Sequence, residues 1–104
     1  MYIADGKTNG PAFSWPDGKR IAVMVTFDYD AEFLRISRAK SKGTSIGFTD
    51  FSRGQYGPHE GLARCLDMLD TMNIKSTFFV PGAVIETYRD TVEEIHRRGH
   101  ELAC

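Results

Sequence analysis

Cysteine is scarce in this sequence: only Cys65 and Cys104 occur among its 104 residues. Two cysteines are too few for the disulfide framework of a small secreted domain, and their separation matches no metal-binding spacing. Cys65 falls on the apolar stripe of an expected helix, so we predict that it is a buried and inert thiol.

Long apolar runs and an excess of one charge are also missing. No stretch approaches the ~20 apolar residues that span a bilayer, and the polar residues 1–10 lack the apolar core of a signal peptide. The net charge is −1, and the richest basic stretch, residues 35–42, indicates a solvated loop. A nucleic-acid surface needs a clustered positive excess. We therefore expect a cytoplasmic protein with neither a membrane nor a nucleic-acid partner.

Residues 1–20 predict an irregular N-terminal arm, with turn chemistry at residues 15–19. The next stretch, residues 20–27, is a continuous apolar run rich in β-branched side chains. Such a run is typical of a strand covered on both faces in a parallel sheet. Residues 31–57 hold four glycines and show no clear period. We expect a long functional loop there, with at most a short helix around residues 30–37.

The clearest helical pattern covers residues 58–73, where apolar side chains recur every three or four positions. Pro58 suits its first turn, and Asn73 suits the left-handed position after its end.

Further along, residues 75–80 predict a second strand, and a second helix begins near residue 83 or 87 and ends at residue 98. Gly99 is its expected cap, and residues 100–104 begin a third strand. The order βαβαβ implies a parallel sheet with right-handed crossovers. Because a buried-type strand is a poor place for a domain to end, we expect the sequence to be truncated at its C-terminus.

The pair Asp28 and Asp30 is the sharpest chemical signal in the chain. Both acids follow the first apolar run directly, at the carboxyl end of a predicted parallel strand, where the ligands of α/β folds gather. Residues i and i+2 of an extended segment point to the same side, so both carboxylates can face one pocket. A divalent cation or a shared proton would relieve their repulsion. One acid could then bind a metal while the other accepts a proton from water.

Two other interpretations of the pair stay open. One acid could cap a following helix while the other is solvated. A phosphotransferase of the Asp-x-Asp-x-Thr type would use Asp28 as its nucleophile, but residues 31–32 are Ala-Glu where that pattern needs threonine.

The three histidines do not form a metal-binding motif. His59 opens an expected helix, and His96 lies on the solvated end of another. His100 opens the third expected strand, where packing or hydrogen bonding is favoured over a direct role in a site. His96 and His100 have the H-x-x-x-H spacing, but the expected helix end at Gly99 lies between them, so we do not expect them to bind one metal ion.

Four segments in order resemble the polysaccharide deacetylases, carbohydrate esterase family 4 with the NodB homology fold. Residues 15–20 followed by residues 21–30 look like the family's lead-in and first motif, usually Thr-Phe-Asp-Asp or a variant. Residues 52–57 (Ser-Arg-Gly-Gln-Tyr-Gly) are similar to a loop of its intracellular-type, allantoinase-like branch. Residues 77–82 and 99–102 resemble the second strand and the approach to the second motif.

The resemblance implies a distorted (β/α) barrel with its site at the carboxyl ends of the strands. Asp28 would be the general base and Asp30 a zinc ligand, so Zn²⁺ is the expected cofactor. The family's two metal-binding histidines belong to a motif that would begin after Cys104, and His100 precedes that motif. Residues 21–104 are therefore expected to be the N-terminal part of a truncated catalytic domain, with the barrel not closed.

The activity implied is metal-dependent hydrolysis of carbon–nitrogen bonds other than peptide bonds. N-acetylated sugars or polysaccharides are the first expected substrates. Small cyclic amides, the substrates of allantoinase- or imidase-like members of this fold, are the alternative. The missing secretion signal favours cyclic amides, because polymeric cell-wall substrates lie outside the membrane.

The incomplete ligand set has a physical consequence for the 104 residues alone. One carboxylate, even beside a second, provides too few ligands for a catalytic zinc site, and three strands leave apolar faces uncovered. We expect this chain alone to be inactive and aggregation-prone, with a missing C-terminal part or another subunit as the partner that covers its strands. An inactive remnant that serves only in assembly is the remaining alternative.

Overall fold

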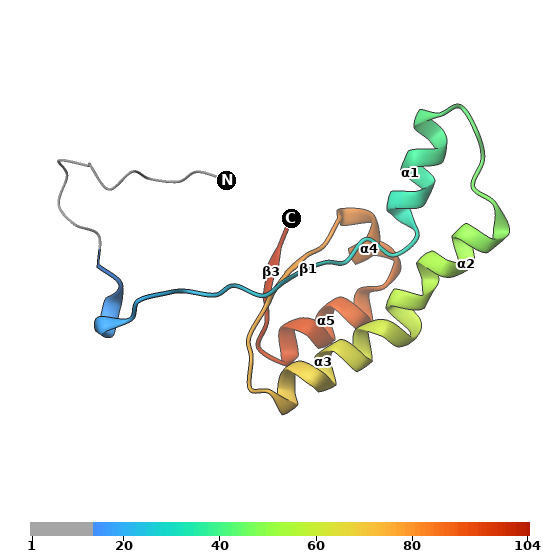
Figure 1. The fold of residues 1–104 in the computed structure, drawn as a ribbon. Coiled ribbons are helices and arrows are strands. Elements are labelled where there is room, and N and C mark those ends of the chain that lie inside the picture. The colour runs from blue at the N-terminus through green and yellow to red at the C-terminus, as the bar shows by residue number, and fades with distance from the viewer. Residues whose placement is uncertain (1–13) are drawn as a thin grey trace, which may run out of the picture.

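The computed structural model describes residues 14–104, so the expected arm is described from residue 14 onward and residues 1–13 lie outside the described part. Within residues 14–104, no helix is long and apolar enough to cross a membrane. The elements, in chain order (Figure 1), are the 3₁₀ turn η1 (Pro16–Gly18), β1 (Thr26–Asp28), α1 (Phe33–Ser41), α2 (Phe48–Tyr56), the π-helical segment η2 (Gly57–Gly61), α3 (Leu62–Thr71), β2 (Thr77–Phe79), α4 (Gly82–Thr87), α5 (Arg89–Arg97) and β3 (Glu101–Ala103).

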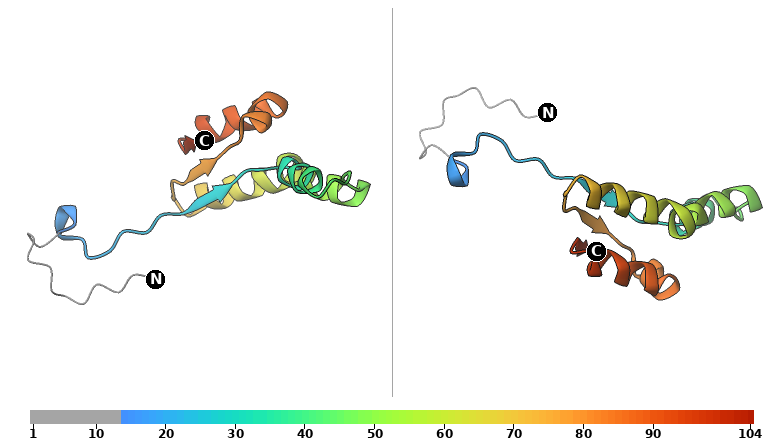
Figure 2. Two further views of the ribbon diagram at one scale, coloured as in Figure 1. Left: turned by 90° about the horizontal axis from the view of Figure 1, so that it is seen from above. Right: turned by 90° about the horizontal axis from the view of Figure 1, so that it is seen from below.

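The three strands form one parallel sheet in the order β1-β2-β3. The register pairs Phe27 with Phe78, and Phe78 with Leu102. Parallel neighbours need a crossover connection, and helices provide it in both cases. α3 and α5 lie side by side below the strands in Figure 1, and Figure 2 shows them from two further directions. The fold class is therefore α/β with a βαβαβ order, which confirms the prediction.

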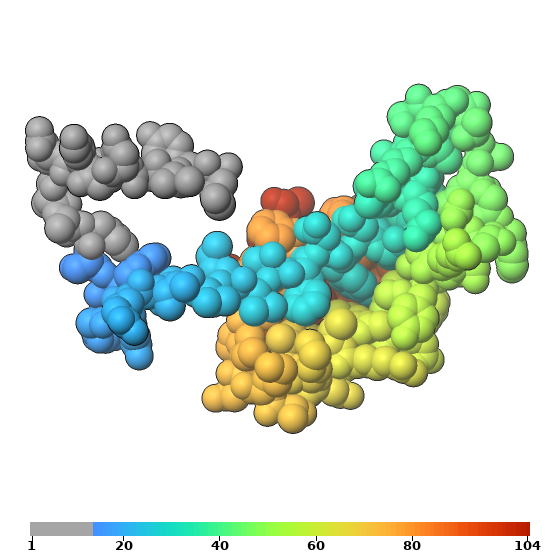
Figure 3. Space-filling model, in the orientation of Figure 1, coloured from blue at the N-terminus to red at the C-terminus, as the bar shows by residue number. Residues whose placement is uncertain are grey.

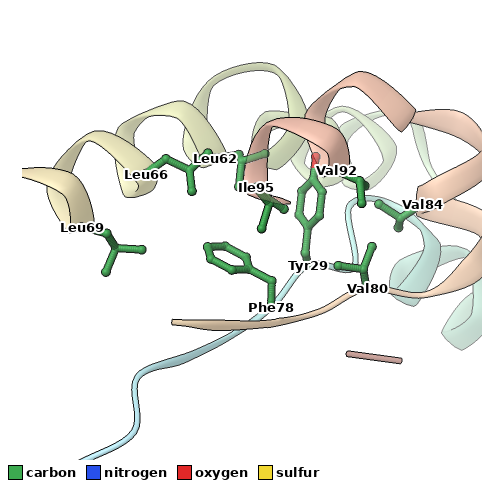
Figure 4. Packing of buried hydrophobic residues seen from close by; sticks show 9 residues of the cluster. All are labelled: Tyr29, Leu62, Leu66, Leu69, Phe78, Val80, Val84, Val92 and Ile95. Atoms are coloured by element: carbon green, nitrogen blue, oxygen red, sulfur yellow. The ribbon is translucent and has the colours of Figure 1, made fainter. Parts of the chain in front are cut away.

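One face of the sheet and these two helices enclose the hydrophobic core (Figure 4). Phe78 is 1% exposed, and its ring stacks on that of Phe27 with the centroids 4.9 Å apart. A fully buried side chain of this kind stabilises the fold by ~1.5–3 kcal/mol. The other buried members of the core come from the segments after β1 and β2, from α4 and from the two long helices: Tyr29, Leu62, Leu66, Leu69, Val80, Val84, Val92 and Ile95.

Arg98, directly after α5, adds an electrostatic link between the two helices. Its guanidinium lies 2.7 Å from the carboxylate of Asp67 and 2.9 Å from that of Asp70, both on α3. The ion pairs join the exposed sides of the helices whose apolar sides meet in the core.

Two predicted helix ends are confirmed, and one predicted helix is divided. Asn73 has φ 53° after α3, and Gly99 has φ 81° after α5, the left-handed geometry that ends a helix. The helix expected up to residue 98 is two helices, because Tyr88 has φ −121° and ψ 44°, outside the helical range.

The strand expected over residues 20–27 is much shorter than its apolar pattern predicts. Val23 and Met24 precede β1 and are 79% and 87% exposed. β2 begins at Thr77, whose N–H donates to the carbonyl of Val25 at 3.2 Å, so β2 does not reach the earlier residues. This segment lies uncovered on the surface (Figure 3). The prediction of a strand covered on both faces is wrong for the described part of the chain.

The prediction of a long loop over residues 31–57 is also wrong, because α1 and α2 form a helical hairpin there (Figure 1). Nor does Pro58 begin a new helix, since α2, η2 and α3 follow one helical path. Proline lacks an N–H and its ring clashes with the carbonyl four residues earlier. The local widening to a π-helix at η2 accommodates both effects.

The sheet is open in the described part of the chain. β1 and β3 each pair along one edge only, whereas a barrel closes when every strand pairs along both. On the face away from α3 and α5, Phe79 is 42% exposed. The Cα radius of gyration is 18.6 Å, against the ~13 Å expected for a compact domain of about 100 residues. The barrel is not closed within these residues, as predicted.

Candidate functional site

Asp28 is the last residue of β1, and Asp30 follows two positions later. The residue between them, Tyr29, is 6% exposed and points into the core (Figure 4). In an extended segment successive side chains point to opposite sides, so both acids point away from that core. Asp28 is exposed and Asp30 is partly buried. This alternation favours one side of the strand end for both carboxylates, and their shared orientation stays a prediction.

Both carboxylates are available to a ligand. Among residues 14–104, neither Asp28 nor Asp30 forms a side-chain hydrogen bond or an ion pair. The residue that precedes α1 is Glu32, and it makes no side-chain capping bond. The interpretation of one acid as a helix cap is wrong.

These two acids supply part of a metal site. Carboxylate oxygens bind Zn²⁺, Mg²⁺ and Mn²⁺, and two unpartnered carboxylates at the end of one strand fit that chemistry. In the described residues, however, no three His, Cys, Asp or Glu side chains come together in a way that could hold a metal ion. A catalytic zinc ion normally takes three protein ligands. A cation bound at Asp30 would therefore need further donors from outside residues 14–104.

Tyr29 anchors the strand end from which the acids project. Its N–H donates to the carbonyl of Phe79 at 2.9 Å, which continues the β1–β2 ladder by one residue. Its phenol oxygen lies 2.8 Å from Oγ1 of Thr91 at the start of α5. Burial raises the pKa of Tyr29, so its hydroxyl stays protonated and hydrogen-bonded at neutral pH.

Glu32 follows Asp30 by two positions, and the sequence pattern did not single it out. It is 4% exposed, and its two carboxylate oxygens lie 2.9 and 3.0 Å from the phenol oxygen of Tyr88. Burial, and then the hydrogen bond to Glu32, raise the pKa of Tyr88. The continuation Asp28-x-Asp30-x-Glu32 could have drawn attention to a third acid. Its partner lies 56 positions away, however, and no local pattern points to it.

A cavity of about 180 Å³ borders Asp28 on the side of α3. Gly57, Gly61 and Cys65 line it together with the strand. Cys65 is only partly buried, so the prediction of a buried thiol is wrong.

Among residues 14–104, no histidine joins the two acids in a group that could hold a metal ion, and His59 meets the ring of Tyr88 edge-on. His59 and His96 are exposed. His100 is 4% exposed, its Nδ1 accepts the N–H of Ser76 at 3.2 Å, and its ring meets Phe78 edge-on. It precedes β3, at the amino ends of the parallel strands, whereas Asp28 ends β1. His100 is thus a packing and hydrogen-bonding residue.

Most of the chain is similar in sequence to known proteins. The family model for polysaccharide deacetylases matches residues 16–104. A peptidoglycan deacetylase-like protein of Gibberella zeae is 29% identical over 87 residues, covering 82% of this chain and 25% of that protein. A peptidoglycan deacetylase of Helicobacter pylori is 30% identical over 86 residues, covering 83% of this chain and 28% of that protein.

The solved structures include a close counterpart of this fold. The crystal structure of a Mycobacterium smegmatis protein named as a polysaccharide deacetylase superposes with a TM-score of 0.73 at 40% sequence identity. The match covers 90% of this chain and 33% of that structure, so the chain spans about a quarter to a third of its relatives' length. The family model covers nearly all of the chain, and the chain belongs to the polysaccharide deacetylase family.

Proposed function

We propose that the complete protein is a metal-dependent hydrolase that removes acetyl groups from N-acetylated sugar polymers. The observation that carries this proposal is the position of two unpartnered carboxylates, Asp28 and Asp30, at the carboxyl end of β1. Family membership supports the reaction class, and two relatives named for peptidoglycan deacetylation support the polymer as substrate.

In this proposal the two acids have different roles. Asp30 is a metal ligand, with Zn²⁺ as the expected ion. When bound, a divalent cation acts as a Lewis acid on the acetamide carbonyl. Asp28 is the general base: one of its carboxylate oxygens accepts a proton from the attacking water. Its exposure leaves it accessible to a substrate that approaches the carboxyl end of the sheet.

The remaining parts of the site would come from a longer chain. We propose that residues 21–104 are the N-terminal part of the catalytic domain, with residues 1–20 as an arm. The open edges of β1 and β3 then receive the strands that close the barrel. The further metal ligands would lie in that additional part.

An assay of the complete protein on two substrate classes tests the proposal. We expect acetate release from N-acetylated chitooligosaccharides, its loss after chelation, and its recovery with Zn²⁺. Asp30→Asn should lose this activity, and Glu93→Gln, an exposed substitution on α5, is its matched control and should keep it. Ring opening of hydantoin-type cyclic amides without acetate release would replace the proposal by the cyclic-amide alternative. Absence of both activities and of zinc binding would favour the non-enzymatic remnant.

A further inference from the structure

We propose that Glu32 and Tyr88 are positioning residues for Asp30, and that their hydrogen bond fixes the turn that carries this proposed metal ligand. The inference rests on the proposed function for the role of Asp30. Its other basis is the geometry of residues 30–33, which lie beyond the last hydrogen bond of the strand ladder.

Asp28 and Asp30 are held by different means. Asp28 lies within β1 and pairs with Phe79 across the ladder. The ladder's final bond runs from the Tyr29 N–H to the Phe79 carbonyl, so Asp30 is the first residue beyond it. Its carbonyl accepts the N–H of Phe33 at 3.1 Å, and that bond closes the turn into α1. The position of Asp30 therefore depends on this turn.

The turn between β1 and α1 contains one strained residue, Ala31. Ala31 has φ 49°, a left-handed conformation that residues with a Cβ adopt at an energetic cost. Such a conformation persists when the surrounding structure over-determines it. Glu32 supplies that constraint, because it is almost fully buried and its carboxylate is held by the Tyr88 phenol.

The backbone of Tyr88 is also held by a hydrogen bond. It occupies the break between α4 and α5, where its N–H donates to the Val84 carbonyl at 2.8 Å. The phenol of Tyr88 thus joins the break between α4 and α5 to Glu32, and it ties the turn before α1 to the helices that follow β2.

Glu32 is unsuited to the alternative role of a metal ligand. Its carboxylate is buried, and the phenol of Tyr88 lies within hydrogen-bond distance of both of its oxygens, whereas Asp30 is partly exposed and unpartnered. Residues that orient a metal ligand without touching the metal typically change its affinity by ~10–100-fold when removed. A purely structural residue would instead lower the stability of the whole domain.

Tyr88→Phe in the complete, metal-free protein tests the inference by amide hydrogen exchange. Losing one buried hydrogen bond to a carboxylate should make exchange of the Phe33 amide about tenfold faster, while the Phe78 amide in the sheet is unchanged. Glu32→Gln keeps an oxygen that accepts the phenol's hydrogen bond and should lie closer to wild type. Tyr56→Phe, at an exposed tyrosine on α2, is the matched control.

Zinc titration of the same variants provides the second measurement. Tyr88→Phe should weaken zinc binding about tenfold, and Tyr56→Phe should leave it unchanged. Equal acceleration of the Phe33 and Phe78 amides, or unchanged zinc affinity alongside loss of binding in Asp30→Asn, would overturn the positioning role. Wild-type zinc affinity in Asp30→Asn would instead overturn the proposed function, whatever the exchange rates show.

Discussion

Gly54 packs directly against the backbone of Glu32. A Cβ built on Gly54 would lie 2.4 Å from Cα and 2.7 Å from Cβ of Glu32. Only glycine allows α2 to approach the turn after β1 this closely. Three positions along the same helical path, Gly57 lies 4.0 Å from the ring of Tyr29 by the same measure. The glycines within residues 52–57 thus shape the surface against which the acidic strand end rests.

Gly54→Ala should destabilise the complete protein, because the added methyl group meets backbone atoms that cannot move aside. We expect a loss of about 1–3 kcal/mol in the free energy of unfolding, the usual cost of overpacking. Denaturant unfolding measures it. Gly82→Ala on α4 is the control, since a Cβ there meets nothing within 4 Å and should be neutral or slightly stabilising. Equal stability of the two variants would contradict the close approach.

Stability should fall with acidification because of His100. Burial, followed by the charge of Lys75, lowers the pKa of His100 below its ordinary value of 6.5. Between pH 6.5 and the pKa of His100 in the folded state, the unfolded chain therefore binds more protons than the folded chain. The stability contributed by the neutral His100 is fully present above pH 6.5 and is lost as the pH falls towards the folded-state pKa.

His100→Asn keeps an oxygen that can accept the Ser76 N–H and removes the titrating ring. Unfolding of the complete protein measured from pH 7.5 to 5.5 should show a shallower decline in this variant than in wild type. His96→Gln, on the exposed side of α5, retains His100 and should follow the wild-type curve. Identical slopes for wild type and His100→Asn would be inconsistent with this origin.

Residues 1–104 alone should lack deacetylase activity and self-associate. The metal site has too few donors among the described residues, and apolar side chains such as Val23, Met24 and Phe79 are exposed. We expect size-exclusion chromatography to show multimers and a hydrophobic dye to bind. A monomeric preparation that unfolds cooperatively would refute this expectation.

The sequence pattern predicted the parts of the fold that depend on local chemistry. Asn73 and Gly99 have left-handed backbone angles at the two helix ends that the sequence predicts. The order of strands and helices followed from apolar periodicity. The position of Asp28 at the end of β1 followed from the point where the apolar run stops.

Other features depend on contacts that no local pattern contains. The apolar run before β1 has the composition of a buried strand, but no neighbouring strand of the described chain extends beside Val23 and Met24. The sequence pattern allowed a short helix around residues 30–37, where α1 lies, but α2 was missed because glycine, serine and threonine obscure its helical period. In the sequence, Glu32 resembles an ordinary surface acid. Only the fold brings the phenol of Tyr88 within hydrogen-bond distance of its carboxylate.

In the proposed reaction Asp30 binds the metal and Asp28 accepts the proton. Zinc content and kcat, measured together for Asp28→Asn and Asp30→Asn in the complete protein, test it most directly. Asp30→Asn should lose zinc, whereas Asp28→Asn should retain zinc and lose about 10²–10⁴-fold in kcat, the usual contribution of a general base. Wild-type zinc content in Asp30→Asn, or near-wild-type kcat in Asp28→Asn, would contradict the account.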